Sequence, residues 1–483
     1  MAGRDTRHAR RSGDRFLRWF PIVLVLVVLA AAAASYRFEL GPRWFGLEAA
    51  DPVTNPAAVA PPEGLALPEP DAPAPVAAST DASSPLDAAK VRRALAGALG
   101  DPDLGPHVLA AVAQLDDATP VFTRGAGVAM PASTMKLMTT TAALATMGPD
   151  HTFSTRVVDG GGNRIVLVGG GDPFLASRPA SDTAYPRRAD VVTLARATAR
   201  ALRADGTRRV HLEYDASLFT GPRVDPHWPD DYVPDGVVAP ISALWVDEGR
   251  PATGLGRVAD PPAAAAAAFA AALDRSGIKV VGDPRPGRAD AQAAPLASVE
   301  SAPLSEIVEQ VLSVSDNEGA EVLGHHVGIA TGGSGSFADG ASGVTRALDA
   351  LGVPLRGAEV YDGSGLSRED RLAPGTLAAV LSLAASEEHP ELRAVVSGLP
   401  VAGFSGSLET RFEDAAPQGR GRVRAKTGTL TGVSALAGVA TDLDGNPMVF
   451  VLVADRVALE DTLDAREALD ALAAGLGACH CGR

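Results

Sequence analysis

A proline-rich stretch separates the beginning of this 483-residue chain from the rest of it. Nine prolines fall within residues 51–86, among alanine, aspartate and serine. Proline fixes its own backbone angle and donates no hydrogen bond, so a segment this rich in proline is extended and cannot bury a core. The sequence therefore predicts a linker over residues 37–86 and a folded part that begins near Leu86.

The segment before the linker has the pattern of an export signal. Residues 1–18 carry six arginines against two aspartates, and an uninterrupted apolar run covers residues 19–34. Arginines before an apolar run stay on the cytoplasmic side of a membrane. We therefore predict a cytoplasmic segment 1–18 and a signal anchor or transmembrane segment 19–36. The folded part would lie outside the cytoplasm, tethered to the cell membrane, or be secreted if the signal is cleaved.

Helical and strand patterns alternate through the folded part. Apolar residues recur at helical spacing in residues 190–204, 262–276, 304–313 and 318–330. Near the C-terminus, two apolar strand-like runs flank Asp444-Gly445, a dipeptide typical of hairpin turns. Helices that share a core with an antiparallel sheet predict an α+β fold.

Charge and cysteine count exclude several classes of protein. The formal net charge of −15 argues against a nucleic-acid binder, because phosphate contacts need a basic surface. The two cysteines, Cys479 and Cys481, are too few for a disulfide framework or a four-ligand zinc site. We interpret the pair as a feature of the tail, with a C-x-C disulfide or a weak metal clip as the alternatives.

Lysine is the scarce cation, with four lysines against 39 arginines. A desolvated lysine can lose its proton, whereas arginine effectively cannot. Ser133-Thr-Met-Lys136 places a hydroxyl and an amine three positions apart on one helix face, so the lysine can activate the serine. Ser276-Gly-Ile-Lys279 has the same spacing, but Gly277 ends the preceding helix there. We expect its two side chains to face different ways.

Two further short motifs follow in the second half of the chain. Asparagine is rare in this chain, with four in all, and Ser315-Asp-Asn317 is the only S-x-N motif in the sequence. Taken alone, such a motif is an ordinary helix cap. Lys426-Thr-Gly428 is expected to start a strand, where glycine allows a substrate backbone to approach and lysine supplies positive charge.

The motifs S-x-x-K, S-x-N and K-T-G in this order resemble the signature of penicillin-binding proteins and serine β-lactamases. The chain is most similar to the low-molecular-mass class C penicillin-binding proteins, the D-alanyl-D-alanine carboxypeptidase/endopeptidase family. Family-like segments cover most of residues 87–475, among them IVLVGGGDPFL, PISALWVDEG, YDGSGLSRED and VRAKTGTLTGVSALAGVA. Within PISALWVDEG, Asp247 and Glu248 follow ISALW at a place where the family would be expected to have an amide residue.

The resemblance implies a penicillin-binding/β-lactamase-like catalytic domain with extra domains inserted between its first two motifs. Ser133 and Ser315 lie 182 positions apart, which is long for a plain β-lactamase. The expected boundaries are residues 87–155 for the first part of the catalytic domain, 156–298 for the inserted domains and 299–483 for the second part.

The resemblance also implies the role of each catalytic residue. Ser133 would be the nucleophile that forms the acyl-enzyme, and Lys136 its base. Ser315 would relay a proton to the leaving group, and Asn317 would bind the substrate amide.

The third motif would bind the substrate. Lys426 and Thr427 would hold its terminal carboxylate, and Gly428 would let the substrate backbone approach closely, next to the oxyanion hole. That hole would be formed by the backbone N–H groups of Ser133 and Thr429. Such a donor typically contributes about 3–4 kcal/mol to lowering the barrier.

These residues predict a serine-type D-Ala-D-Ala carboxypeptidase that acts on peptidoglycan stem peptides and is inhibited by β-lactam antibiotics. Neither cofactor nor metal is expected, and DD-endopeptidase activity is left open. A Ser-His-Asp hydrolase lacks its G-x-S-x-G motif here, and a metalloprotease lacks H-E-x-x-H. His325-His326 are interpreted as packing or surface residues. A serine β-lactamase and a catalytically inactive cell-wall-binding protein remain the alternatives.

Overall fold

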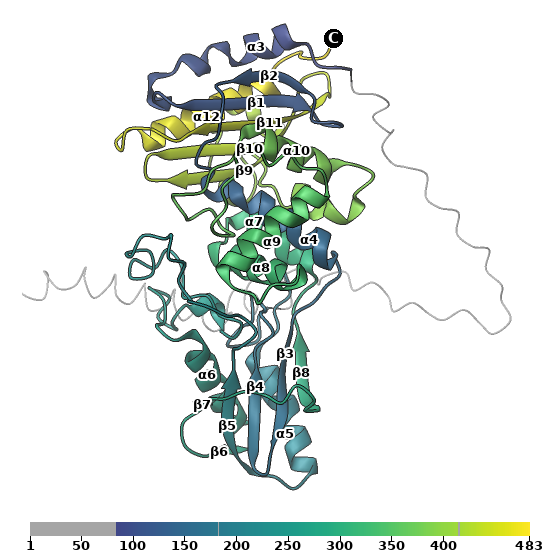
Figure 1. Cartoon of the computed structure of the whole chain (residues 1–483), viewed down its shortest axis with the longest axis vertical. Coiled ribbons are helices and arrows are strands. Elements are labelled where there is room, and N and C mark those ends of the chain that lie inside the picture. The colour runs from purple at the N-terminus through teal and green to yellow at the C-terminus, as the bar shows by residue number, and fades with distance from the viewer. Residues whose placement is uncertain (1–83, 182, 414–415) are drawn as a thin grey trace, which may run out of the picture. The chain divides into compact units, whose positions relative to one another are not determined.

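The computed structural model describes residues 84–181, 183–413 and 416–483 (Figure 1). The chain divides into two compact units, 1–79 and 80–483, and the second contains all the described residues. The expected anchor, residues 19–36, and nearly all of the expected linker lie outside the described residues. Among the helices of the described ranges, none has the length and apolar character needed to cross a bilayer.

A five-stranded antiparallel sheet is built from both ends of the folded part. Its strand order is β2-β1-β11-β10-β9, so the C-terminal hairpin sits between the first strand and an edge strand. The hairpin turns at the predicted Asp444-Gly445, and Lys426 in β9 lies opposite Ala437 in β10. The strands are β1 (Val108–Gln114), β2 (Pro120–Arg124), β9 (Val423–Leu430), β10 (Val433–Thr441) and β11 (Pro447–Ala454).

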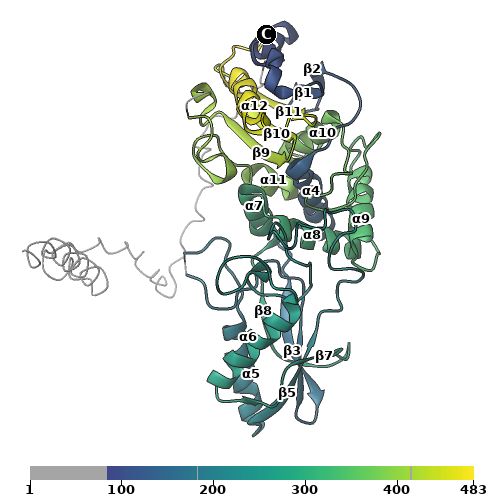
Figure 2. The same ribbon diagram turned by 90° about the vertical axis from the view of Figure 1, so that its left-hand side faces the viewer.

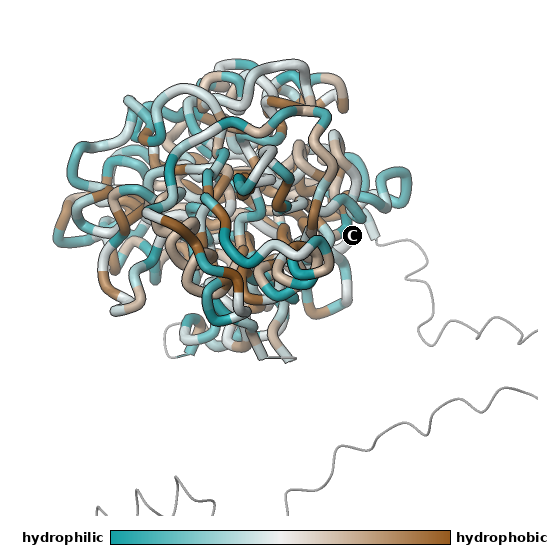
Figure 3. Tube along the Cα trace, turned by 90° about the horizontal axis from the view of Figure 1, so that it is seen from below, coloured by the Kyte–Doolittle hydropathy of each residue, from teal (hydrophilic) through white to brown (hydrophobic). Residues whose placement is uncertain are grey.

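Helices cover both faces of this sheet. Because successive strand residues point to opposite faces, Phe450 and Leu452 pack with α3 and α12, whereas Val449 and Val451 pack with the helices on the other face. Figure 3, which views the chain trace from below, shows hydrophilic and apolar residues alternating along it. The helices are α3 (Ala88–Ala96) and α12 (Thr462–Gly477) on the first face, and α4 (Lys136–Met147), α7 (Leu304–Val314), α8 (Asn317–Ala330), α9 (Phe337–Ala350), α10 (Pro374–Ala385) and α11 (Arg393–Ser397) in the helical layer of the other.

A second sheet occupies the chain between α4 and α7. Its order is β6-β5-β4-β3-β8, with α5 and α6 packed in its own hydrophobic core. Helices α4, α7, α8 and α9 lie between the two sheets in both Figure 1 and Figure 2. We call residues 154–300 the inserted region. Its elements are β3 (Ser154–Gly161), β4 (Arg164–Val168), α5 (Val191–Ala204), β5 (Arg209–Asp215), α6 (Pro261–Arg275), β6 (Lys279–Val280), β7 (Arg285–Pro286) and β8 (Pro295–Glu300).

The C-terminal tail closes against the start of the folded part. Cys479 and Cys481 form a disulfide, which was the less favoured interpretation of this pair from the sequence. The backbone N–H of Asp87 donates to the carbonyl of Cys481, and Asp442 accepts from the Cys481 N–H at 2.9 Å. The tail therefore fastens the first residues of the fold to the hairpin.

Candidate active site

Ser133 and Lys136 lie together at the start of α4. Ser133 belongs to a short 3-10 turn, η3 (Ala132–Met135), and Lys136 is the first residue of the helix. Lys136 Nζ donates a hydrogen bond to Ser133 Oγ at 3.0 Å, while its side chain is completely buried. Burial lowers the pKa of Lys136 to about 8, although the nearby carboxylates of Asp362 and Glu321 raise it in part. The amine can therefore be neutral near physiological pH.

Two further acceptors hold the Lys136 amine in place. Its Nζ donates to Asn317 Oδ1 and to the carbonyl oxygen of Ser364, each at 2.8 Å. With Ser133 this makes three partners, so the lysine has little freedom to move. The first and second sequence motifs thus meet at one nitrogen atom.

Ser315 meets the third motif across the same site. Lys426 Nζ donates to Ser315 Oγ at 2.7 Å and to the carbonyl of Thr427 at 2.8 Å. Burial lowers the pKa of Lys426 well below its ordinary value, and the neighbouring cation Lys136 adds to this shift. Ser315 itself is not a helix cap on α8, because Asp316 caps that helix through the N–H of Gly319.

The backbone at Ser315 adopts an uncommon conformation. Its φ of +61° lies in the left-handed region, where a residue with a Cβ is strained. This conformation ends α7 and lets the chain turn at once into α8. Such strain persists only where the surroundings fix it, and it is often found at functional sites.

Strand β9 offers an open edge beside these side chains. Its first residues are covered, because Ala402 N–H donates to the carbonyl of Val423 and Ala425 N–H donates to that of Pro400. Beyond Ala425, no strand of the described ranges pairs with this edge. Since backbone groups alternate in direction along a strand, those of Thr427 and Thr429 face the same open edge as Ala425. The K-T-G motif thus lies in the middle of β9, not at its start as predicted.

Two glycines let the backbone close in around Ser133. A Cβ on Gly428 would lie 2.8 Å from the carbonyl oxygen of Pro131, so β9 reaches the segment before Ser133 only with glycine there. A Cβ on Gly365, where φ is +82°, would lie 1.9 Å from the carbonyl oxygen of Ala132. The sequence interpretation assigned Gly428 to the approach of a substrate, whereas its nearest neighbours are residues of the protein.

Substituting Gly365 with alanine tests how tightly this segment is packed. We expect Gly365→Ala to lower the free energy of unfolding by about 4 kcal/mol, from left-handed strain and from the clash with Ala132. Gly127→Ala is the matched control, because φ there is +96° and nothing lies within 4 Å of its added Cβ. The control should lose about 1 kcal/mol in urea unfolding. Equal losses in the two variants would contradict the close packing around Ser133.

Sequence reasoning missed the loop that presents Ser364 to Lys136. Glu321, on α8, accepts hydrogen bonds from the N–H groups of Gly363 and Ser364 at 3.0 and 2.8 Å. Asp362 accepts from the indole N–H of Trp228 at 2.7 Å. Burial and the neighbouring Asp362 raise the pKa of Glu321 well above its usual range. The segment YDGSGLSRED carried this loop in the sequence, but no spacing rule connected it to Lys136.

The second S-x-x-K copy does not form a site. The Ser276 hydroxyl donates to the carbonyl of Ala272 at 2.9 Å, and Lys279 Nζ donates to Asp274 at 3.1 Å. The Lys279 side chain is 65% exposed. The two side chains therefore engage different partners, as the sequence predicted.

His325 and His326 are packing residues. His326 stacks on Phe153 with ring centroids 4.1 Å apart, and His325 meets Phe337 edge-on at 4.6 Å. Burial lowers the pKa of His325 to about 4 and that of His326 to about 3. Both rings are therefore neutral at ordinary pH, and neither is hydrogen-bonded to a serine in the described ranges.

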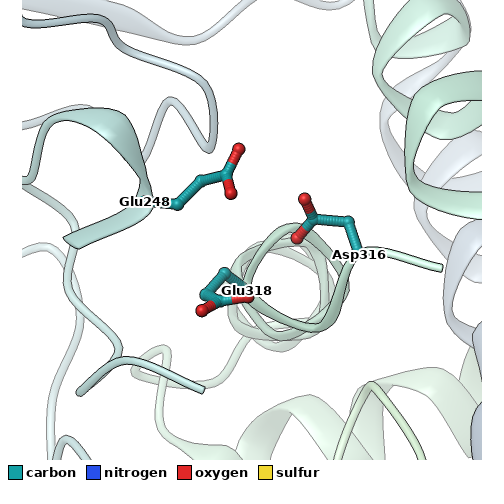
Figure 4. A group of neighbouring side chains, drawn as sticks. All are labelled: Glu248, Asp316 and Glu318. Carbon is teal, nitrogen blue, oxygen red and sulfur yellow. The ribbon is translucent and has the colours of Figure 1, made fainter. Parts of the chain in front are cut away.

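A group of three carboxylates lies against the S-x-N motif. Acidic oxygens of Glu248, Asp316 and Glu318 fall within 4.8 Å of one another (Figure 4). Arg257 donates to Glu318 at 2.7 Å, and Arg250 donates to Glu248 at 2.8 Å. Burial and the neighbouring Glu248 raise the pKa of Asp316 to about 7. Arginines thus balance this cluster, and we assign no metal to it.

The arrangement as a whole defines a class of protein. A buried S-x-x-K pair at the start of a helix, an S-x-N turn beside it and a K-T-G edge strand of an antiparallel sheet are the features of penicillin-binding proteins and serine β-lactamases.

Comparisons with known proteins define the family more narrowly. The profile of the family described as D-Ala-D-Ala carboxypeptidase 3 (S13) matches residues 91–256 and 250–476. A carboxypeptidase of Mycobacterium tuberculosis is 38% identical over 83% of this chain and 86% of its own length. Carboxypeptidase DacB of Mycolicibacterium smegmatis is 36% identical over 95% of this chain and 96% of its own length. The chain belongs to the D-Ala-D-Ala carboxypeptidase S13 family.

A solved structure supports the α+β fold independently. Penicillin-binding protein 4 of Haemophilus influenzae aligns with a TM-score of 0.65 and 20% sequence identity, over 81% of this chain and 98% of that one. At this identity the match concerns the fold alone. The predicted α+β, penicillin-binding class of fold is thereby confirmed.

Proposed function

We propose that this protein is a serine-type D-alanyl-D-alanine carboxypeptidase that acts on peptidoglycan stem peptides through an acyl-enzyme on Ser133. The observation that carries the proposal is the hydrogen bond from the buried, pKa-lowered Lys136 to Ser133 Oγ, beside the open edge of β9. A D-alanyl-D-alanine carboxypeptidase of an Actinomadura strain, 31% identical over 74% of this chain, supports the substrate class.

The acyl transfer follows from these positions. Neutral Lys136 takes the proton of Ser133, whose Oγ bonds to the carbonyl carbon of the penultimate D-alanine. The C–N bond to the terminal D-alanine then breaks, and a proton passes to its nitrogen by way of Ser315, which Lys426 contacts at 2.7 Å. Water afterwards attacks the ester, which releases the shortened peptide and restores the Ser133 hydroxyl.

Strand β9 and the residues around it would orient the substrate. An extended peptide can add to an open strand edge through main-chain hydrogen bonds, which suits the end of a stem peptide. The Lys426 amine and the Thr427 hydroxyl, itself 2.9 Å from Ser407 Oγ, would donate hydrogen bonds to the terminal carboxylate. The N–H groups of Ser133 and Thr429 would receive the developing oxyanion.

β-Lactams fit the same scheme as inhibitors, because their strained amide acylates a serine and keeps the leaving group attached. Penicillin-binding protein 4 of Haemophilus influenzae has been solved in complex with a β-lactam and matches this fold with a TM-score of 0.58. The class A deacylating glutamate motif E-x-x-L-N is absent from this sequence. We therefore favour a peptidase over a β-lactamase, with DD-endopeptidase activity as a second reaction of the same site.

The test uses the full chain with a peptide that ends in D-Ala-D-Ala. We expect stoichiometric release of free D-alanine, together with one long-lived covalent adduct after incubation with penicillin. Released D-alanine is measured by coupled oxidation, and the adduct by intact mass. Rapid loss of the adduct without D-alanine release would instead support the β-lactamase. Neither product from folded protein would favour the inactive cell-wall-binding protein.

We also propose that residues 19–36 tether the enzyme to the cell membrane, with the folded part on the outer side. The basic residues 1–18 and the apolar run behind them support this placement. Peptidoglycan as the substrate agrees with it, since the wall lies outside the cytoplasm. Fractionation of cells that express the full chain would test it, and a fully released protein would point to cleavage.

A further inference from the structure

The inserted region contacts the S-x-N turn directly. Arg257 Nε donates to Glu318 Oε1 at 2.7 Å, and the N–H of Ala239 donates to the same oxygen at 3.2 Å. The Asn317 amide donates to the carbonyl of Val237 at 3.4 Å. Three hydrogen bonds thus join the segment 237–257 to two consecutive residues at the start of α8.

The ion pair among these contacts is buried. The Arg257 side chain is 7% exposed and that of Glu318 is 2% exposed. Figure 4 shows Glu318 at the start of the helix, with Asp316 beside it and Glu248 approaching from the inserted region. A buried ion pair with good geometry fixes the relative position of its two elements, because neither charge can be left unpaired there.

The turn held in this way is the one that both lysines contact. Asn317 accepts from Lys136, and Ser315 accepts from Lys426. Since Ser315 is in the left-handed region, the turn needs support from outside to keep its shape. A small displacement of the turn would weaken both contacts at once.

We propose that Arg257 is a positioning residue for acyl transfer, through which the inserted region holds the Ser315–Glu318 turn in its productive place. This inference rests on the proposed function, and it gives the inserted region a part in the reaction. Arg257 acts through Glu318 and touches none of the reacting groups. Its effect should therefore appear in the acylation rate of correctly folded protein.

The test measures the acylation rate constant with a fluorescent penicillin, per titratable site, on the full chain. We expect Arg257→Met to slow acylation at least about 10-fold, because small misplacements of catalytic groups have effects of this size. Arg257→Lys keeps the charge and should recover part of the rate. The double variant Arg257→Met/Glu318→Gln leaves no unpaired charge and keeps an acceptor for the Ala239 N–H, so it should fold with a near-normal Tm and still react slowly.

Arg223→Met is the matched control. Arg223 pairs with Asp260 in the same inserted region, but both side chains are about half exposed, at 46% and 53%. This variant should acylate at the wild-type rate. A double variant as fast as wild type would overturn the positioning role while leaving the proposed function intact. Wild-type protein that binds no penicillin would overturn both.

Discussion

Alanine in place of Ser133 should leave the protein folded and without any covalent penicillin adduct. We expect D-alanine release to fall about a million-fold, the scale on which serine hydrolases depend on their nucleophile. The physical reason is that no other hydroxyl in the described ranges accepts a hydrogen bond from the buried Lys136 amine. Intact mass after penicillin treatment and D-alanine release under single-turnover conditions measure the two effects.

Ser276→Ala is a control that the chain itself provides. Ser276 has the same spacing to a lysine, but its hydroxyl is bonded to the helix backbone and Lys279 pairs with Asp274. This variant should form the adduct and release D-alanine as the unchanged protein does. An adduct that persists in Ser133→Ala, or disappears in Ser276→Ala, would contradict the assignment of the nucleophile.

The comparison of the two serines shows what the sequence could predict about the site. Spacing alone could not separate Ser133 from Ser276, whereas the order of three motifs and the glycine at 277 could. The contacts of Lys136 with Asn317 and of Lys426 with Ser315 agree with that order. Motifs of this kind predict which side chains meet, because the chemistry requires particular residue types.

Other parts of the site could not be predicted, for physical reasons that differ. The left-handed conformation of Ser315 is imposed by tertiary packing, since nothing local favours it in a serine. The contact of Lys136 with the Ser364 carbonyl could not be predicted from residue types, because every residue has a backbone carbonyl. The ion pair of Arg257 and Glu318 joins residues 61 positions apart on different parts of the fold. Single-sequence patterns do not connect such residues.

The fold was predictable where periodicity was strong. The helices expected at 190–204 and 262–276 lie at Val191–Ala204 and Pro261–Arg275, and the hairpin turns at the predicted dipeptide. The strand order was not predictable, because β1 pairs with β11 across nearly the whole folded part. The K-T-G motif was misplaced to the start of a strand because the alternation of Val423-Arg424-Ala425 before it covers only three residues, too few to establish a strand period.

The general base gives the other large expected effect. Lys136→Arg keeps a positive charge but cannot supply a neutral amine, because arginine does not lose its proton in proteins. We expect the acylation rate constant to fall by about 10²- to 10⁴-fold, the usual contribution of a general base. Stopped-flow acylation by a fluorescent penicillin, followed from pH 6 to 10, is the measurement.

The pH dependence separates a lost base from a disturbed fold. With a pKa of about 8, Lys136 is mostly protonated below that pH, so the wild-type rate should rise with pH and level off above 8. On the acid side the slope should be about tenfold per pH unit. The variant should lose this rise, while Lys279→Arg, at a 65% exposed lysine, should keep both rate and profile. A Lys136→Arg protein with the wild-type profile would place the base elsewhere, and the second buried amine, Lys426 beside Ser315, would then be the group to test.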